Sequence, residues 1–109
     1  MNAEEFVKIW KQEKDDQLKG YLTENKTQVA IDINKLQLDN NQGEILKTIL
    51  DNILTDTYYT FLLGLDGCAN IGGLQQTYTI QDADGNVIKS TGDIEAEAYY
   101  HFIELEQKT

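Results

Sequence analysis

The sequence predicts an α+β fold in which a small antiparallel sheet of about three to four strands packs against helices, in the approximate order α-(β)-α-β-β-β-α. Stretches with apolar residues at helical spacing predict helices near the N-terminus, in the middle of the chain and at its end. An apolar run at residues 57–66 and an alternating stretch at residues 75–81 predict strands. The chain has 109 residues and no visible linker, so we expect one domain over residues 1–109.

Residues 2–19 predict the first helix, because Asn2 can cap it and an apolar face follows at helical spacing. That face consists of Phe6, Ile9 and Trp10. The polar stretch 11–17 is expected to lie in solvent. Gly20 is expected to end the helix.

Residues 23–40 allow two interpretations. Val29, Ile31 and Ile33 alternate with smaller or polar residues, and their β-branching favours a half-buried strand. Val29, Ile33 and Leu36 also fit the stripe of a helix. We expect the strand and leave the helix open.

Residues 40–54 predict the clearest helix, with a cap at Asp39, Asn40 or Asn41. Its wide apolar face consists of Ile45, Leu46, Ile49, Leu50, Ile53 and Leu54. We expect this face to pack on the sheet rather than to bind a partner.

Residues 57–66 are apolar on both alternating faces, which predicts the central strand, and Gly64 leaves room for a close neighbour. Strict alternation over residues 75–81 predicts a strand with one face in water. A turn at residues 82–86 and a returning strand at 87–89 complete a hairpin.

The last helix is expected to open at residues 90–93, with Thr91 or Asp93 as its cap, and to run to about residue 106. Its buried stripe is expected to consist of Ile94, Ala98, Phe102 and Leu105.

A glycine-rich corner after the central strand is the first candidate site. It lacks the spacings of phosphate-binding loops, so it is either a tight turn with positive φ at Gly67 and at Gly72 or Gly73, or a surface for a partner. The candidate interaction surface comprises Asp66, Gly67, Cys68, Asn70, Gly72, Gly73, Gln75, Thr77 and Thr79.

The alternative is a small-ligand or enzymatic site built around the corner 66–73, which would use Asp66 and Cys68 with His101 as an optional third residue. Asp66 would raise the pKa of the Cys68 thiol rather than activate it, so we expect a semi-buried, unreactive thiol. The chain has a single histidine and no paired cysteines. Neither a metal site nor a cofactor site is therefore expected from these residue types. We therefore assign no catalytic, metal-binding or cofactor-binding residue, and we expect no cofactor.

The net charge is −10, and the chain has nine lysines and no arginine. This charge disfavours contact with nucleic-acid backbones or anionic membranes. It either serves only to keep a small protein in solution or attracts a basic protein partner. A homo-oligomer and an acidic mimic of nucleic acid are the alternatives. The N-terminus lacks the features of a signal peptide and one cysteine cannot form an internal disulfide, so we expect a cytoplasmic protein.

The segment LLGLDGCANIGGLQQTYTIQDADGNVI, followed by GDIEAEAYYHF, resembles a pattern in small acidic bacterial proteins, some of them associated with toxin–immunity loci. The resemblance covers Phe61 to Phe102 and assigns no chemical role to any residue. It implies a non-catalytic protein-binding module similar to an immunity protein.

Overall fold

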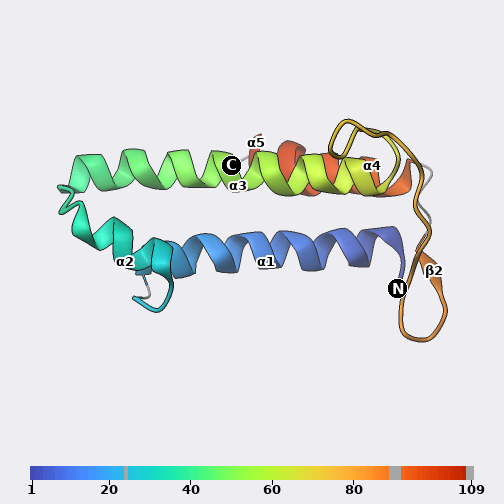
Figure 1. Cartoon of the computed structure of the whole chain (residues 1–109), viewed down its shortest axis with the longest axis horizontal. Coiled ribbons are helices and arrows are strands. Elements are labelled where there is room, and N and C mark those ends of the chain that lie inside the picture. Colours follow the sequence, from blue (N-terminus) through green and yellow to red (C-terminus); the bar gives the residue numbers. More distant parts are fainter. Residues whose placement is uncertain (24, 89–91, 108–109) are drawn as a thin grey trace.

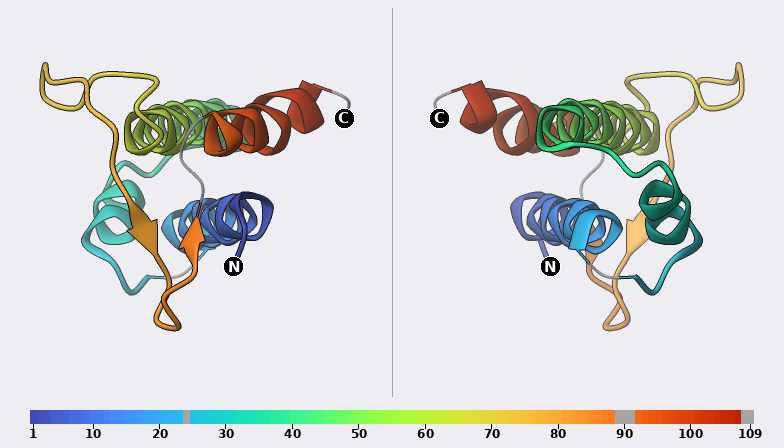
Figure 2. Two further views of the ribbon diagram at one scale, coloured as in Figure 1. Left: turned by 90° about the vertical axis from the view of Figure 1, so that its right-hand side faces the viewer. Right: turned by 90° about the vertical axis from the view of Figure 1, so that its left-hand side faces the viewer.

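The computed structural model describes residues 1–23, 25–88 and 92–107 and shows a mostly helical molecule (Figure 1). Two long antiparallel helices, α1 and α3, lie side by side, and a C-terminal helical run packs beside them (Figure 2). The helices are α1 (Ala3–Thr23), α2 (Gln28–Lys35), α3 (Asn40–Leu65), α4 (Asp93–Ala98), the π-helical η1 (Tyr99–Glu104) and α5 (Leu105–Gln107).

The predicted α+β fold with a sheet of three to four strands is wrong. Within the described residues the only sheet pairs two short antiparallel strands, β1 (Ile80–Gln81) and β2 (Val87–Ile88). The predicted hairpin is therefore confirmed over residues 80–88, but residues 75–79 lie outside its strands and residue 89, the expected end of the returning strand, lies outside the described residues. The core lies mainly between α1, α3 and the C-terminal run, and Ile88 of β2 is buried in it.

The predicted central strand at residues 57–66 is the second half of α3. Asp39 starts this helix with a reciprocal capping box: its carboxylate accepts from the Gln42 N–H, and the Gln42 side chain accepts from the Asp39 N–H. Residues 57–65 are apolar on several sides because α1 covers one side of the helix, the C-terminal run a second, and the Ile71 side chain packs on Gly64. An apolar helix surrounded in this way has the composition of a buried strand.

The strand expected around residues 29–33 is also wrong, and the helical alternative holds. Thr27 caps α2, since its Oγ1 accepts a hydrogen bond from the Ala30 N–H at 3.1 Å. Ala30 is the buried residue of this helix, whereas Val29 and Ile31 are 37% and 36% exposed. Two of the three β-branched residues thus lie on the surface, and Ile33 is half-buried.

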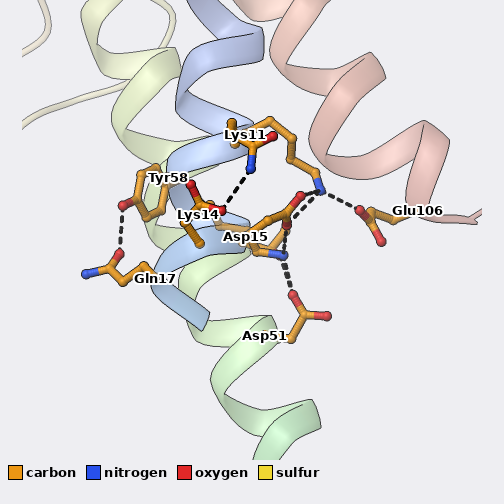
Figure 3. A network of polar contacts seen from close by, with 10 residues as sticks. Lys11, Lys14, Asp15, Gln17, Asp51, Tyr58 and Glu106 are labelled. Atoms are coloured by element: carbon orange, nitrogen blue, oxygen red, sulfur yellow. Dashed lines mark hydrogen bonds and ion pairs between the residues drawn. The ribbon is translucent and has the colours of Figure 1, made fainter. Parts of the chain in front are cut away.

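Helix α1 begins as predicted, with the Asn2 side chain accepting from the Glu5 N–H at 2.8 Å, but it continues through Gly20 to Thr23. The expectation that residues 11–17 lie in solvent is wrong at Lys14, which is 2% exposed. Its ammonium forms an ion pair with Asp51 of α3 and lies 3.6 Å from Asp15 (Figure 3). A buried charged contact therefore joins the two long helices.

Ile94, Ala98 and Phe102 are buried against α1 and α3, as the helical stripe predicts. The prediction that Leu105 belongs to this buried stripe is wrong, since Leu105 is 36% exposed. The cause is η1, where the Leu105 N–H bonds to the Tyr100 carbonyl five residues earlier, so the turn holds one more residue than an α-helical turn.

The expected cap of this last helix is absent. Gly92 occupies the N-cap position with φ of +92° and offers no side chain, Asp93 is the first helical residue, and Thr91 lies outside the described residues. The free backbone N–H groups in the first turn of α4 must therefore find a hydrogen-bond acceptor elsewhere in the chain.

Asp82 organises the hairpin turn. Its carboxylate accepts from the Asp84 and Asn86 N–H groups at 3.0 and 2.9 Å, and it pairs with the Met1 ammonium at 3.0 Å. The ammonium and these hydrogen bonds lower the pKa of Asp82 to about 2.

We expect the Asp82 carboxylate to titrate near pH 2 in a carbon-detected NMR titration, well below the ordinary value for an aspartate of about 3.9. Because its pKa is lower in the folded chain, Asp82 stabilises the fold above about pH 4, and this contribution is lost as the pH falls towards 2. The matched variant Asp82→Asn removes that part of the pH dependence. A titration midpoint near 4 would contradict the assignment.

Candidate functional site

The glycine-rich corner is a tight turn, and its predicted backbone geometry is confirmed. Gly67, Gly72 and Gly73 have φ of +76°, +60° and +86°. Ile71 and Leu74 exchange two backbone hydrogen bonds of 2.8 and 3.1 Å around the two central glycines, as in a type I′ turn.

The corner is fixed to the end of α3 by two close approaches. A Cβ on Gly64 would lie 2.5 Å from Ile71 Cγ1, so the missing side chain admits Ile71 against the helix. A Cβ on Gly67 would lie 2.9 Å from Thr77 Cγ2, and the Gln75 side-chain amide donates to the Gly67 carbonyl at 2.9 Å. The corner is therefore held in place by its own sequence.

The candidate surface residues of this region differ in exposure. Asp66 is buried and Gly67 is half-buried. The exposed members are Cys68, Asn70, Gly72, Gly73, Gln75, Thr77 and Thr79. Asp66 is therefore not accessible to a partner, whereas the other polar side chains of the candidate surface are.

Asp66 supplies the cap that α4 lacks. It is 2% exposed, and its Oδ2 accepts a hydrogen bond of 2.8 Å from the N–H of Glu95, in the first turn of α4. A negative carboxylate at a helix N-terminus accepts a hydrogen bond from a free N–H and interacts favourably with the positive end of the helix dipole. The role of Asp66 is therefore to join the end of α3 to the start of α4.

Cys68 is exposed rather than semi-buried, and its thiol is not activated. A hydrogen bond to Glu95, desolvation of the sulfur atom and the negative charge of Asp66 raise its pKa to about 12. His101 lies elsewhere, with Nε2 3.5 Å from Glu97 Oε2 and its ring against Tyr100. The described contacts thus do not join the three residues of an enzymatic site.

We expect Cys68 to react with iodoacetamide at pH 8 roughly fiftyfold more slowly than a free cysteine thiol, because very little of it is thiolate. Glu95→Gln removes the first cause of the raised pKa and should speed the reaction severalfold. Asp93→Asn, a neutralised carboxylate at the start of the same helix, should leave the rate unchanged. Mass spectrometry of the alkylated protein measures the rates, and a normal rate in the parent protein would refute the assignment.

An apolar hollow that the sequence does not predict lies between α1 and α3. We call it the open groove; it has a volume of about 320 Å³ and is lined by Trp10, Gln17, Leu54, Thr57, Tyr58 and Phe61. The Trp10 ring lies against Tyr58 and Phe61, with centroids 5.8 and 5.6 Å apart. Phe61 itself is 43% exposed.

A row of exposed isoleucines on α3 winds from the outer face of this helix towards the open groove. Ile45, Ile49 and Ile53, here called the isoleucine ridge, are 54%, 48% and 53% exposed. They follow at intervals of four residues and lead into Thr57 and Phe61. The expectation that this stripe packs on a sheet is wrong, since only its leucine side is partly buried.

No cluster of at least three histidine, cysteine or acidic residues within the described ranges could hold a metal ion. None of the helices in those ranges is both long and apolar enough to cross a bilayer. Comparison with family models, with curated proteins and with solved structures finds no match to this chain.

Proposed function

We propose that the chain is a non-catalytic protein-binding module, similar to an immunity protein, that binds a basic protein. The observation that carries this proposal is the isoleucine ridge together with the open groove. Monomeric soluble proteins rarely expose contiguous apolar surface of this kind unless a partner covers it. The half-exposed Phe61 and the adjacent Trp10 are residue types enriched at binding hot spots and interface cores.

The charge of the chain supports a basic partner. With a net charge of −10, attraction accelerates association with a basic protein and opposes association with an acidic one. The raised pKa of Cys68 argues against thiol chemistry at the corner. A cytoplasmic location fits this function, and the exposed corner residues Asn70, Gln75, Thr77 and Thr79 are a second candidate contact.

Capture of partners from source-cell extract at low ionic strength tests the function. Ile49→Glu places a charge in the isoleucine ridge and should weaken capture of the basic partner about tenfold, because part of an isoleucine side chain loses its apolar contact. The added negative charge would strengthen a purely electrostatic contact, so a loss reports apolar binding.

Thr48→Glu is the matched control, since it places the same charge on an exposed position of α3 outside the ridge. It should bind as the parent protein does, and rising salt should weaken the complex of both. Equal capture by Ile49→Glu and the parent protein, or an acidic partner, would contradict the proposal.

A further inference from the structure

We infer that two copies of the chain join along the outer edge of β1, with the segment 75–81 of each copy paired antiparallel about a two-fold axis at Tyr78. This inference goes beyond the proposed function, because it uses a surface separate from the isoleucine ridge and the open groove. Three observations carry it: the direction of the backbone groups along this edge, the absence of charge and proline from it, and its near-palindromic sequence QQTYTIQ.

The pairing of β1 with β2 decides which backbone groups face outward. The Asp82 N–H donates to the Asn86 carbonyl at 3.0 Å, so these two residues form a hydrogen-bonded pair. In antiparallel strands such pairs alternate with non-hydrogen-bonded pairs. The backbone of Ile80 therefore faces its partner Ile88, whereas the N–H and C=O of Gln81 point away from β2.

The same alternation continues into the segment before β1. Residues 75–79 run in an extended path from the glycine-rich corner into β1, the outer strand of the hairpin, with β2 nearer α1 (Figure 2). Tyr78 is half-buried, whereas Thr77, Thr79 and Gln81 are exposed, as alternation in a strand requires. The N–H and C=O of Thr77 and Thr79 thus face outward, and none of the described residues bonds to them.

This edge has none of the features that usually block strand pairing. Natural proteins protect exposed edges with charged residues, prolines or bulges. Residues 67–81 contain no charged residue and no proline, although 26% of the chain is charged. Two copies with a net charge of −10 each can therefore meet at this edge without placing like charges directly opposite each other. Threonine, tyrosine and isoleucine also favour strands, so the segment has the residue types of a paired strand.

The order of the residues along the edge suits a second copy of the chain. From Tyr78 in either direction, the outward residues repeat: Thr77 and Thr79 come first, then Gln75 and Gln81. A two-fold axis at Tyr78 places Thr77 opposite Thr79 of the second copy, and Gln75 opposite Gln81 of the second copy. The paired residues all belong to the outward-facing set, so they can exchange backbone hydrogen bonds. Cross-strand threonine pairs add a contact between side chains.

The contact is small and joins two acidic chains, which determines how the dimer should respond to conditions. An edge of seven residues is about 23 Å long, and its pairing buries less than the roughly 1,200 Å² of a standard interface. The dimer should therefore dissociate on dilution. Added salt should strengthen it, because salt screens the repulsion between the two copies, whereas the complex with a basic protein should weaken.

Backbone amide exchange measured by NMR tests the contact residue by residue. The protein is compared at about 20 µM and about 1 mM, with sedimentation equilibrium to measure the dimer at each concentration. The amides of Thr77 and Thr79 should exchange at least fivefold more slowly at the higher concentration. The amide of Ile80, which already faces Ile88, should not change. An isotope-filtered contact between the Thr77 methyl of one copy and the Thr79 methyl of the other would locate the axis at Tyr78.

Variants at one position separate the backbone from the side chain. Thr79→Pro removes an outward N–H and leaves the bonds between β1 and β2 in place, a position where strands tolerate proline. It should weaken dimerisation about thirtyfold, because each dimer loses two donors, with an unchanged circular-dichroism spectrum. Thr79→Ala keeps the N–H and should dimerise within about fivefold of the parent protein.

Two further variants guard against misreading. Thr79→Lys changes no backbone group but adds a charge to the edge, so it should weaken the dimer about tenfold even if Thr79→Pro fails to fold. Ile49→Glu should dimerise as the parent protein does. Loss of the dimer and loss of the basic partner are therefore separate results.

Three results would overturn the inference. A protein that is still monomeric at about 1 mM would exclude the dimer. A dimer that survives Thr79→Pro, with the amides of Thr77 and Thr79 unprotected, would place the contact on another surface. Protection of these amides only in the complex with a captured basic protein would assign the edge to a strand of that partner.

Discussion

Replacement of Asp66 by alanine should lower the free energy of unfolding by about 2 kcal/mol. The substitution removes the acceptor of the Glu95 N–H, and Gly92 has no side chain that could replace it. The N–H would then remain unpaired beside buried residues of α4. Urea unfolding monitored by circular dichroism measures the loss.

Two further variants make this result specific. Asp66→Asn keeps an oxygen that can accept from the Glu95 N–H and should recover about half of the loss. Asp93→Ala removes an exposed carboxylate from the same turn and should change the stability by less than about 0.5 kcal/mol. Equal effects of Asp66→Ala and Asp93→Ala would show that the long-range cap is unimportant.

Replacement of Asp51 by alanine should destabilise the protein by about 2 kcal/mol, because the buried Lys14 ammonium loses its nearer ion-pair partner and keeps only Asp15, 3.6 Å away. The effect is smaller than for a fully buried pair, since the Asp51 side chain is 41% exposed. Lys14→Met removes the charge and keeps an unbranched side chain, so it should be nearly neutral or stabilising. Thermal and urea unfolding of both variants measure the difference.

The control for this pair is Asp56→Ala, an exposed acidic position one turn further along α3. It should change the stability by less than about 0.5 kcal/mol. If Lys14→Met were as destabilising as Asp51→Ala, the attraction between the two charges would exceed the cost of burying them, contrary to our expectation.

Local signals in the sequence predicted the parts of the fold that local chemistry determines. The turn at residues 82–86 follows from an aspartate and a glycine at fixed positions, and the start of α3 follows from Asp39. The positive φ of Gly67 could be predicted because glycine is the residue that adopts this backbone conformation without strain.

The parts of the fold that were predicted incorrectly depend on contacts with residues distant in the sequence. Residues 57–65 have the composition of a strand, but they extend a helix that is already formed, and each added residue contributes one further hydrogen bond. The open groove was missed for the same reason, since Phe61 could not be placed beside Trp10 while it was assigned to a strand.

One missed residue did carry a signal. Lys14 belongs to a row with alternating spacings of four and three residues, which marks the buried side of a helix packed on another. The row consists of Ala3, Val7, Trp10, Lys14, Gln17 and Tyr21. Spacing alone therefore indicated its position, whereas its charge suggested solvent.

The π-helical segment Tyr99–Glu104 also determines where the chain tolerates a change in length. An α-helical turn that gains one residue takes this form, and the extra residue rotates everything that follows without moving Ile94 or Ala98. Deletion of one residue here would restore the regular spacing and rotate the residues that follow by about 100° around the helix axis. The contact between Lys11 and Glu106, now 2.7 Å long, depends on that single additional residue.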